Sequence, residues 1–228
     1  MLTKKYQSQE SAIATYDYYD IASGLGYRVF YGGNLADGSV SGAWVLADNT
    51  FYSNKITTFV LMTEEPQKYA DMRFEVQLNA PRDIKGDLLV CVPVGVGRCT
   101  GDTGDTATVN VSGAVYHFDG TTETNLGSFR STNLVVADAN PKTYNYQVLS
   151  NKVPIARTHF KPGDKLRVQI EGWSVMTGDH SRYMGIGHDP KNRPDPNVAD
   201  KGLTIWDNVN TTYGPTDLQV HVPFILDI

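Results

Sequence analysis

The chain has few of the residues that build disulfide frameworks and metal sites. Its 228 residues include two cysteines, three tryptophans and five histidines. Structural zinc sites use about four Cys or His ligands in short paired spacings, and no second cysteine pair accompanies Cys91 and Cys99. These two either form a disulfide across a hairpin or remain free thiols, and the sequence leaves both open. Because no glycine-rich nucleotide motif occurs either, we expect no bound metal and no cofactor.

Long apolar runs and an excess of positive charge are also missing. No stretch has the roughly 18 consecutive apolar residues of a transmembrane helix, and the N-terminus lacks the apolar core of a signal peptide. The formal net charge is -5, whereas phosphate backbones require a dense cationic face. We therefore expect a protein that is made in a cytoplasm, with no membrane and no nucleic acid as a partner.

A helical period of apolar residues is absent as well, and a period of two takes its place. The clearest case is 165–171, where Leu166, Val168 and Ile170 alternate with polar residues directly after a Pro-Gly-Asp turn. Residues 72–78 alternate in the same way. This pattern indicates strands with one buried face and one solvent face.

Further short segments rich in β-branched and aromatic residues lie between turn residues. We expect strands at 27–31, 44–46, 57–62, 87–94, 106–118, 126–130, 134–136, 144–149, 183–186, 203–206 and 218–222. Many short strands without a helix predict an all-β chain, and more narrowly an antiparallel β-sandwich of jelly-roll type with long loops. We expect residues 1–22 to form an N-terminal arm or edge segment and 23–228 to form a single domain.

Metal-ligating residues gather in one loop only. Asp179, His180, His188 and Asp189 could together hold a divalent ion, but their spacing matches no recognised ligand pattern. The acidic loop 101–105 lacks the ligand set of a calcium-binding EF-hand loop. Both segments are therefore interpreted as solvated loops.

Catalytic patterns are equally weak. Residues 38–42 place Val40 where a nucleophile elbow needs serine. Glu75 and Glu171 are polar members of alternating strands, where a solvated face is expected, and His221 should face solvent or a neighbouring subunit. Since no catalytic set assembles, the sequence predicts that the chain is not an enzyme.

Four segments carry a likeness to a known group of proteins. They are 18–32 (YYDIASGLGYRVFYG), 160–173 (FKPGDKLRVQIEGW), 187–193 (GHDPKNR) and the terminal strand. With these the chain resembles jelly-roll structural proteins that decorate or stabilise the virions of tailed bacteriophages. The resemblance implies a particle component, commonly a trimer on the capsid lattice or a part of the tail. Such proteins share architecture more than motifs, so no functional residue is carried over.

The resulting functional hypothesis is a virion structural protein, specifically a capsid decoration protein that binds and stabilises the head lattice. Its expected partners are further copies of itself, with a trimer favoured, and the major capsid protein. Our candidates for these contacts are Tyr16, Tyr18 and Tyr19 in the arm, with His188 and Arg193 in the long loop.

Two alternatives remain open. The first is a carbohydrate-binding β-sandwich that stacks a glycan on an exposed tryptophan, chosen from Trp44, Trp173 and Trp206. The second is an enzyme acting on polysaccharide, which needs two carboxylates that converge in a groove.

Overall fold

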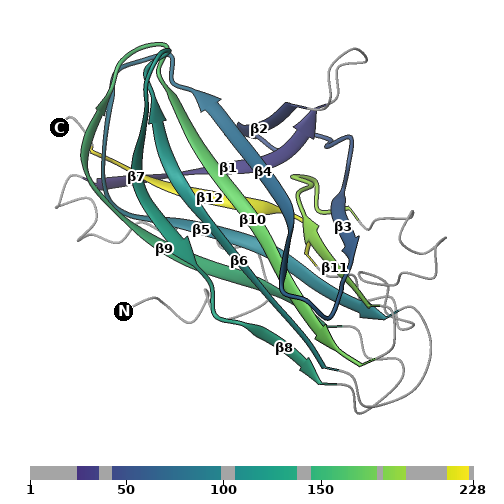
Figure 1. The fold of residues 1–228 in the computed structure, drawn as a ribbon. Coiled ribbons are helices and arrows are strands. Elements are labelled where there is room, and N and C mark those ends of the chain that lie inside the picture. Colours follow the sequence, from purple (N-terminus) through teal and green to yellow (C-terminus); the bar gives the residue numbers. More distant parts are fainter. Residues whose placement is uncertain are drawn as a thin grey trace.

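The computed structural model describes residues 25–35, 43–98, 106–137, 145–178, 182–193 and 215–225, and the fold is all-β (Figure 1). These residues form strands and no helix. The strands are β1 (Leu25–Leu35), β2 (Ala43–Ala47), β3 (Thr57–Leu61), β4 (Gln67–Gln77), β5 (Arg82–Arg98), β6 (Thr106–Phe118), β7 (Glu123–Arg130), β8 (Leu134–Ala137), β9 (Asn145–Phe160), β10 (Lys165–Thr177), β11 (Arg182–Gly187) and β12 (Leu218–Ile225). The prediction of an all-β chain is confirmed. The arm at 1–22 and the strand expected at 203–206 lie outside the described residues.

All twelve strands belong to one open, mixed sheet. Its order is β3-β11-β5-β12-β1-β2-β4-β10-β6-β7, with β8 beside β6 and β9 beside β5. The strand pairs are antiparallel except β2 and β4, which meet in parallel at Val45 and Glu75. The expectation of purely antiparallel pairing is wrong at this place. The physical reason is that the chain leaves β2, forms β3 at the far end of the sheet order and then returns as β4, a crossover of the kind that parallel pairing requires.

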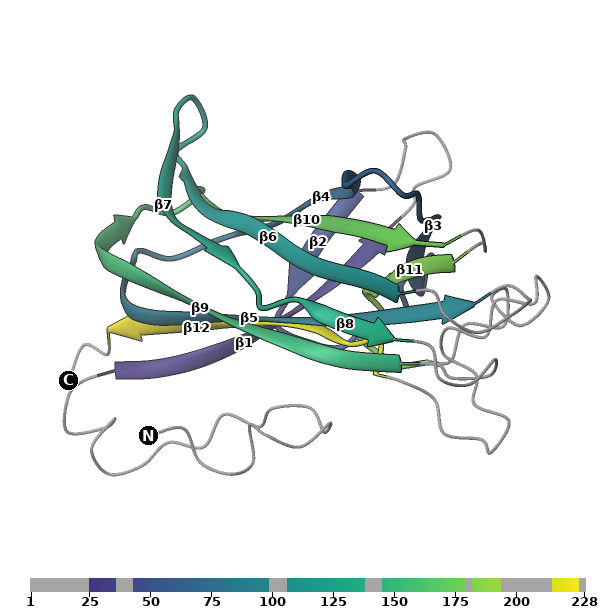
Figure 2. The same ribbon diagram turned by 60° about the horizontal axis from the view of Figure 1, so that its bottom comes forward.

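The sheet curls so that two layers face each other, with β4, β10 and β6 in one layer and β9, β5, β12 and β1 in the other (Figure 2). Alternate side chains of both layers enter one hydrophobic cluster, for example Phe74 and Val168 from the first layer and Val90 from the second. At Gly32 in β1 an added Cβ would lie 2.5 Å from a Leu218 methyl and 3.1 Å from the Phe74 ring. The absence of a side chain there lets the layers approach closely. That residues 23–228 form a single domain stays a prediction.

Strand β10 behaves as its sequence predicts. Buried and partly exposed residues alternate from Lys165 to Met176, and Leu166, Val168 and Ile170 have no exposed surface. The strand lies between β4 and β6 and pairs with both. The strict alternation is therefore the pattern of a central strand with one face in the core.

Strand β9 is longer than expected: Val153 and Ile155 continue the alternation of buried residues beyond Leu149, but Pro154 between them is a residue that usually interrupts a strand. The strand pairs with β5 from Asn145 to Phe160, and Pro154 lies opposite Asp87. Among the described strands β9 pairs with β5 alone, and proline is tolerated in such an edge strand because its missing N–H breaks no ladder.

Strand β12 is buried on both faces, which corrects the expectation for His221. This residue lies between Val29 of β1 and Leu89 of β5, and its side chain is 1% exposed. Its Nε2 lies 3.1 Å from Gln219 Oε1, and Gln219 Nε2 donates to Asp217 at 2.6 Å. Alternation with valines placed His221 on the face opposite the core, but that face of β12 is covered too.

Candidate functional site

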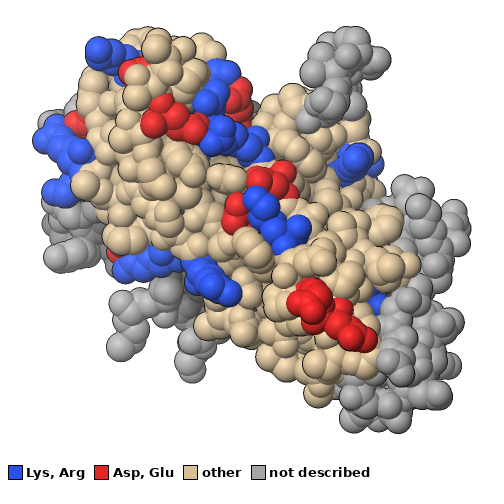
Figure 3. Space-filling model, viewed as in Figure 1, with Lys and Arg blue, Asp and Glu red and all other residues tan. Residues whose placement is uncertain are grey.

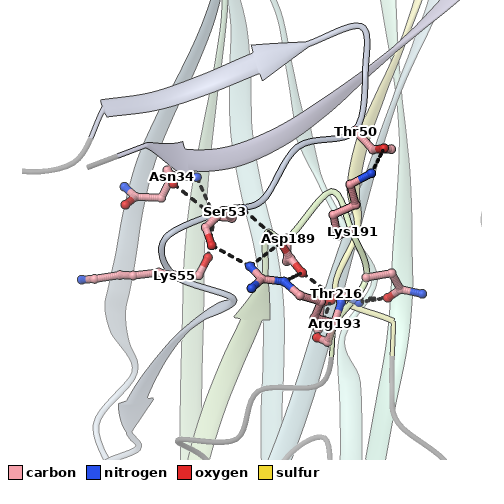
Figure 4. Close-up of polar contacts among 9 residues, drawn as sticks. Asn34, Thr50, Ser53, Lys55, Asp189, Lys191, Arg193 and Thr216 are labelled. Atoms are coloured by element: carbon pink, nitrogen blue, oxygen red, sulfur yellow. Dashed lines mark hydrogen bonds and ion pairs between the residues drawn. The ribbon is translucent and has the colours of Figure 1, made fainter. Parts of the chain in front are cut away.

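Residues 188–193, which follow β11, join segments that are far apart in the sequence (Figure 4). His188 N donates to Ile56 O at 2.9 Å, in the connection between β2 and β3, and Asp189 N donates to Thr216 O at 2.7 Å, just before β12. An added Cβ on Gly187 would lie 2.7 Å from the Thr216 backbone. The turn is therefore packed against the start of β12 without space for a side chain at that point.

Asp189 is the centre of this junction. Its carboxylate has no exposed surface and accepts hydrogen bonds from Ser53 N at 3.2 Å, Arg193 N at 2.9 Å, Arg193 Nε at 2.9 Å and Arg193 Nη2 at 3.1 Å. Arg193 Nη2 also donates to Ser53 O at 2.7 Å. A buried carboxylate requires such partners, since an uncompensated charge in the interior is costly. Asp189 is engaged in structure and is not free to act as a base or a metal ligand.

Further hydrogen bonds, made by Ser53 and Asn192, complete the junction. Ser53 Oγ accepts from Asn34 N of β1 at 2.8 Å and donates to Lys55 O at 2.5 Å. Asn192 adopts a positive φ of 51°, which asparagine tolerates better than most residues. Its Oδ1 accepts from Thr216 N at 2.7 Å. Together with Asp189 and Arg193 these residues hold 188–193 rigidly on β1, β12 and the β2–β3 connection.

The outer side of the junction presents an exposed aromatic ring between two cations, which we call the Tyr52 patch (Tyr52, Lys191 and Arg193). Tyr52 is 67% exposed. Lys191 Nζ lies 5.6 Å and Arg193 Cζ 5.0 Å from the centre of its ring, within the range of cation–π attraction. Lys191 Nζ also donates to Thr50 Oγ1 at 3.0 Å. Tyrosine and arginine are prominent among energetically dominant contact residues, so the patch is suited to bind a protein surface with carboxylates.

The predicted contact residues are placed differently from one another. Arg193 belongs to the Tyr52 patch. His188 is fully buried, with Nε2 3.0 Å from Thr58 Oγ1 and its ring edge-on to Trp44 at 4.8 Å. A partner at this end would therefore meet Arg193 rather than His188. The candidates Tyr16, Tyr18 and Tyr19 lie outside the described residues.

No pattern in the sequence pointed to Tyr52, which lies in a stretch without alternation. In the loop considered for a metal, Asp179 and His180 are outside the described residues and Asp189 is bound to Arg193. No group of three or more His, Cys, Asp or Glu side chains suited to a metal ion is found in the part of the chain that the structure describes. Over that same part, no helix has the length and apolarity needed to cross a membrane.

The solvent side of β4, β10 and β6, which we call the β10 face, is lined by paired charges (Figure 3). Glu75 binds Lys165 at 2.5 Å and Arg167 at 2.9 Å, and Glu171 binds Lys68 at 3.1 Å. Partial burial acts to raise the pKa of Glu75, but the hydrogen bonds from Lys165 and Arg167 outweigh it and lower that pKa overall. Glu75 is therefore ionised at neutral pH and is not a proton donor.

Aromatic side chains lie among these charges. Trp173 is partly exposed, and its Nε1 donates to Ser112 Oγ at 2.9 Å. Tyr116 donates from its hydroxyl to Gln169 Oε1 at 3.2 Å. Trp44, in contrast, packs against the core, and Trp206 lies outside the described residues. Of the two tryptophans in the described residues both are partly exposed, and Trp173 is the one that lies on the β10 face.

No protein-family model matches the chain, and no curated protein matches it. Solved structures with partial likeness include a CocE/NonD family hydrolase from Staphylococcus aureus, at 13% identity and a TM-score of 0.47, covering 88% of this chain and 37% of that one. An aminopeptidase from the marine sediment archaeon Thaumarchaeota archaeon has 9% identity and a TM-score of 0.44, with the same coverage of 88% and 37%. The infectious bursal disease virus structure of the Gx strain has 11% identity and a TM-score of 0.27, covering 95% and 58%.

These comparisons correct one prediction. The expectation that the chain is not an enzyme is contradicted, because a hydrolase and an aminopeptidase are among the solved structures that it matches. That expectation is withdrawn. The chain spans 37% of the length of either enzyme, and at this identity and TM-score the likeness supplies no reaction, substrate or catalytic residue.

Proposed function

We propose that this chain is a structural component of a virus particle, namely a capsid decoration protein that binds and stabilises the head lattice. The observation that carries the proposal is the Tyr52 patch, an exposed tyrosine between two cations on a rigid base. Arg193 is fixed by Asp189 and Ser53, so little side-chain entropy is lost when a partner binds. The charge of Arg193 is compensated by Asp189, whereas Lys191 makes no ion pair within the described residues. A carboxylate of the major capsid protein that binds Lys191 beside the Tyr52 ring is therefore the partner that this chemistry fits.

The segments that carry the bacteriophage resemblance also support the proposal, because three of them meet in space. Strand β1, from the first segment, pairs with the terminal strand β12 from Leu25↔Ile225 to Gly32↔Leu218. Residues 187–193 are bonded to the start of β12 through Thr216. The Tyr52 patch is therefore built on the part of the fold on which the resemblance depends.

The finer fold assignment is part of the same proposal. Two facing layers joined at a corner (Figure 2) are compatible with a jelly roll, in which antiparallel strands wrap around one core. A trimer, in which each subunit directs its Tyr52 patch to the lattice, is the assembly that we propose. Its place of action would be the virion, after synthesis in the host cytoplasm.

Protein composition of the source particle tests this function. Particles purified on a density gradient are analysed by quantitative mass spectrometry, with the major capsid protein as the internal standard. We expect this chain in a fixed ratio to the capsid protein, in the same fractions. Its absence from infectious particles would refute the proposal.

The patch itself is tested by adding purified protein back to particles that lack it. Tyr52→Ala should reduce lattice binding at least tenfold, as truncation of a hot-spot aromatic does. Tyr69→Ala is the control, because Tyr69 lies on a different element, β4, outside the patch. Equal binding by the two variants would exclude the Tyr52 patch as the contact.

A glycan-binding function is the second candidate, and the placement of Trp173 on the β10 face favours it. Its indole N–H lies beside two hydrogen-bonding side chains, namely Ser112 and Glu171, and aromatic rings with nearby polar groups are the usual elements of a small-molecule binding surface. A glycan array tests it. Binding that is lost in Trp173→Ala and kept in Tyr52→Ala would support this function, and an array without any bound glycan would exclude it.

A further inference from the structure

A cavity of about 800 Å³ opens at the corner of the fold where β2 and β4 separate. We call it the corner pocket. Small-molecule sites typically have volumes of roughly 300–1,000 Å³, so the cavity has the size of such a site. It lies among the ends of β1, β2, β4 and β12 and the turn between β4 and β5, whereas the Tyr52 patch is formed by the β2–β3 connection and 188–193.

The strand pairing explains why the corner is open. β1 pairs with β2 as far as Tyr31 and Ala47, and β4 pairs with β10 as far as Gln77 and Lys165. Between β2 and β4, however, Val45↔Glu75 is the single pair. Beyond this pair the facing edges of 46–47 and 76–77 share no ladder. The opening is therefore a consequence of the fold.

The floor of the corner pocket is apolar and continuous with the core. Leu46, Leu78 and Phe224 line the cavity and also belong to the hydrophobic cluster. Each retains between 4% and 8% exposure. Apolar side chains that line a recess favour a ligand with an apolar part, because its binding removes that surface from water.

The rim carries one charge without a partner. Arg28 is paired with Asp48, and both line the cavity. Arg82 also lines it and makes no ion pair within the described residues, because the next residue, Asp83, directs its side chain to the other face of β5 and binds Arg157 and His159. The lining therefore has a net positive charge, and the free guanidinium can bind a carboxylate through two parallel hydrogen bonds.

We propose that the corner pocket binds a small organic acid, with its carboxylate against Arg82 and its apolar part on Leu46, Leu78 and Phe224. The amides of Gln77 and Asn79, which also line the cavity, supply donors and acceptors for further polar groups of the ligand. The source of the carboxylate is either a free organic acid or an acidic sugar, which share this chemistry. The site is independent of the virion function, because it uses none of the residues of the Tyr52 patch.

Ligand-observed NMR with matched probes tests the proposal. Phenylacetate and D-glucuronate are the anionic probes, and phenylacetamide and D-glucose are their neutral counterparts. We expect at least one anion to bind at least tenfold more tightly than its counterpart, and which anion binds distinguishes an organic acid from an acidic sugar. Amide shifts in ¹⁵N spectra should fall in 26–28, 46–48, 76–82 and 224–225. Absence of binding by both anions at 10 mM, or shifts outside these segments, would overturn the proposal.

Variants give a second, independent readout. Arg82→Gln should weaken binding of the anion about 10- to 100-fold, the range expected for loss of a charged hydrogen-bond partner, and Arg82→Lys should retain part of it. Arg130→Gln is the matched control, since Arg130 is exposed and lies at the end of β7. Unchanged affinity in Arg82→Gln, or equal losses in Arg82→Gln and Arg130→Gln, would exclude Arg82 as the anion site. Circular dichroism of each variant verifies that it is folded.

Discussion

Replacing Asp189 should destabilise the protein far more than replacing an exposed acid. In Asp189→Ala, Ser53 N and Arg193 N lose their acceptor, and the Arg193 guanidinium loses the carboxylate that it binds at 2.9 Å. Breaking a fully buried ion pair on one side costs about 3–5 kcal/mol in the free energy of unfolding, but the Arg193 side chain is 35% exposed and water can solvate its charge, so we expect about 2–3 kcal/mol. For a protein of this size each kcal/mol lowers Tm by about 2–4 °C, so Tm should fall by roughly 4–12 °C.

The control is Asp87→Ala. Asp87 pairs with Lys152, and the two side chains are 43% and 60% exposed, so removal of this pair should cost about 0–1 kcal/mol. Urea unfolding followed by circular dichroism gives both free energies. The double variant Asp189→Ala/Arg193→Ala should lose less than the sum of the single losses, because the two side chains interact directly. If Asp189→Ala unfolds at the same urea concentration as Asp87→Ala, the junction does not depend on its buried carboxylate.

Three further outcomes follow from single residues. Burial lowers the pKa of His221 from 6.5 to about 4. Below pH 6.5 the unfolded chain therefore binds a proton at His221 that the folded chain does not, and up to about 3 kcal/mol of stability is lost as pH falls from about 6.5 to about 4. His221→Leu should remove this part of the pH dependence. If the free energy of unfolding in urea changes with pH in the variant as it does in the parent protein, this expectation is contradicted. Burial also raises the pKa of the free Cys91 thiol. In a Cys99→Ser variant a thiol reagent should therefore label the folded protein much more slowly than the urea-unfolded protein. Equal labelling rates would show that Cys91 is accessible in the folded protein. Gly113→Ala would place a Cβ 2.0 Å from Gln169 O and should lower the free energy of unfolding by about 1–3 kcal/mol, measured as a lower Tm. An unchanged Tm would contradict the close approach of β6 and β10 at this point.

Strand β10 shows how much of the fold its sequence determines. The alternation of Leu166, Val168 and Ile170 with polar residues predicted both the strand and its buried face. The second half of β9 was not predicted, since Pro154 between the buried Val153 and Ile155 is a residue that usually ends a strand and is tolerated here because β9 is an edge strand. The parallel pair of β2 and β4 was not predicted either, because strand order depends on contacts that are distant in the sequence.

Local sequence was a poorer guide to the candidate site. Arg193 and His188 were chosen from the same short segment, yet one reaches the surface and the other has no exposure. Their difference arises from contacts with Ser53 and Thr58, which lie more than a hundred positions earlier. The prediction that His221 faces solvent or a neighbouring subunit was wrong for a related reason. The period of a strand shows which residues share a face, but not whether that face is buried.

The edge formed by β9 has a consequence for self-association. Open sheet edges tend to join with other edges into aggregates, and natural proteins interrupt them with proline and charged residues. Along β9 the exposed positions include Lys152, Pro154, Arg157 and His159. A second copy that approached this edge would meet a proline without an N–H donor and a row of basic side chains. Strand-to-strand polymerisation through β9 is thereby disfavoured, so the folded protein can reach a high concentration without forming fibres through this edge.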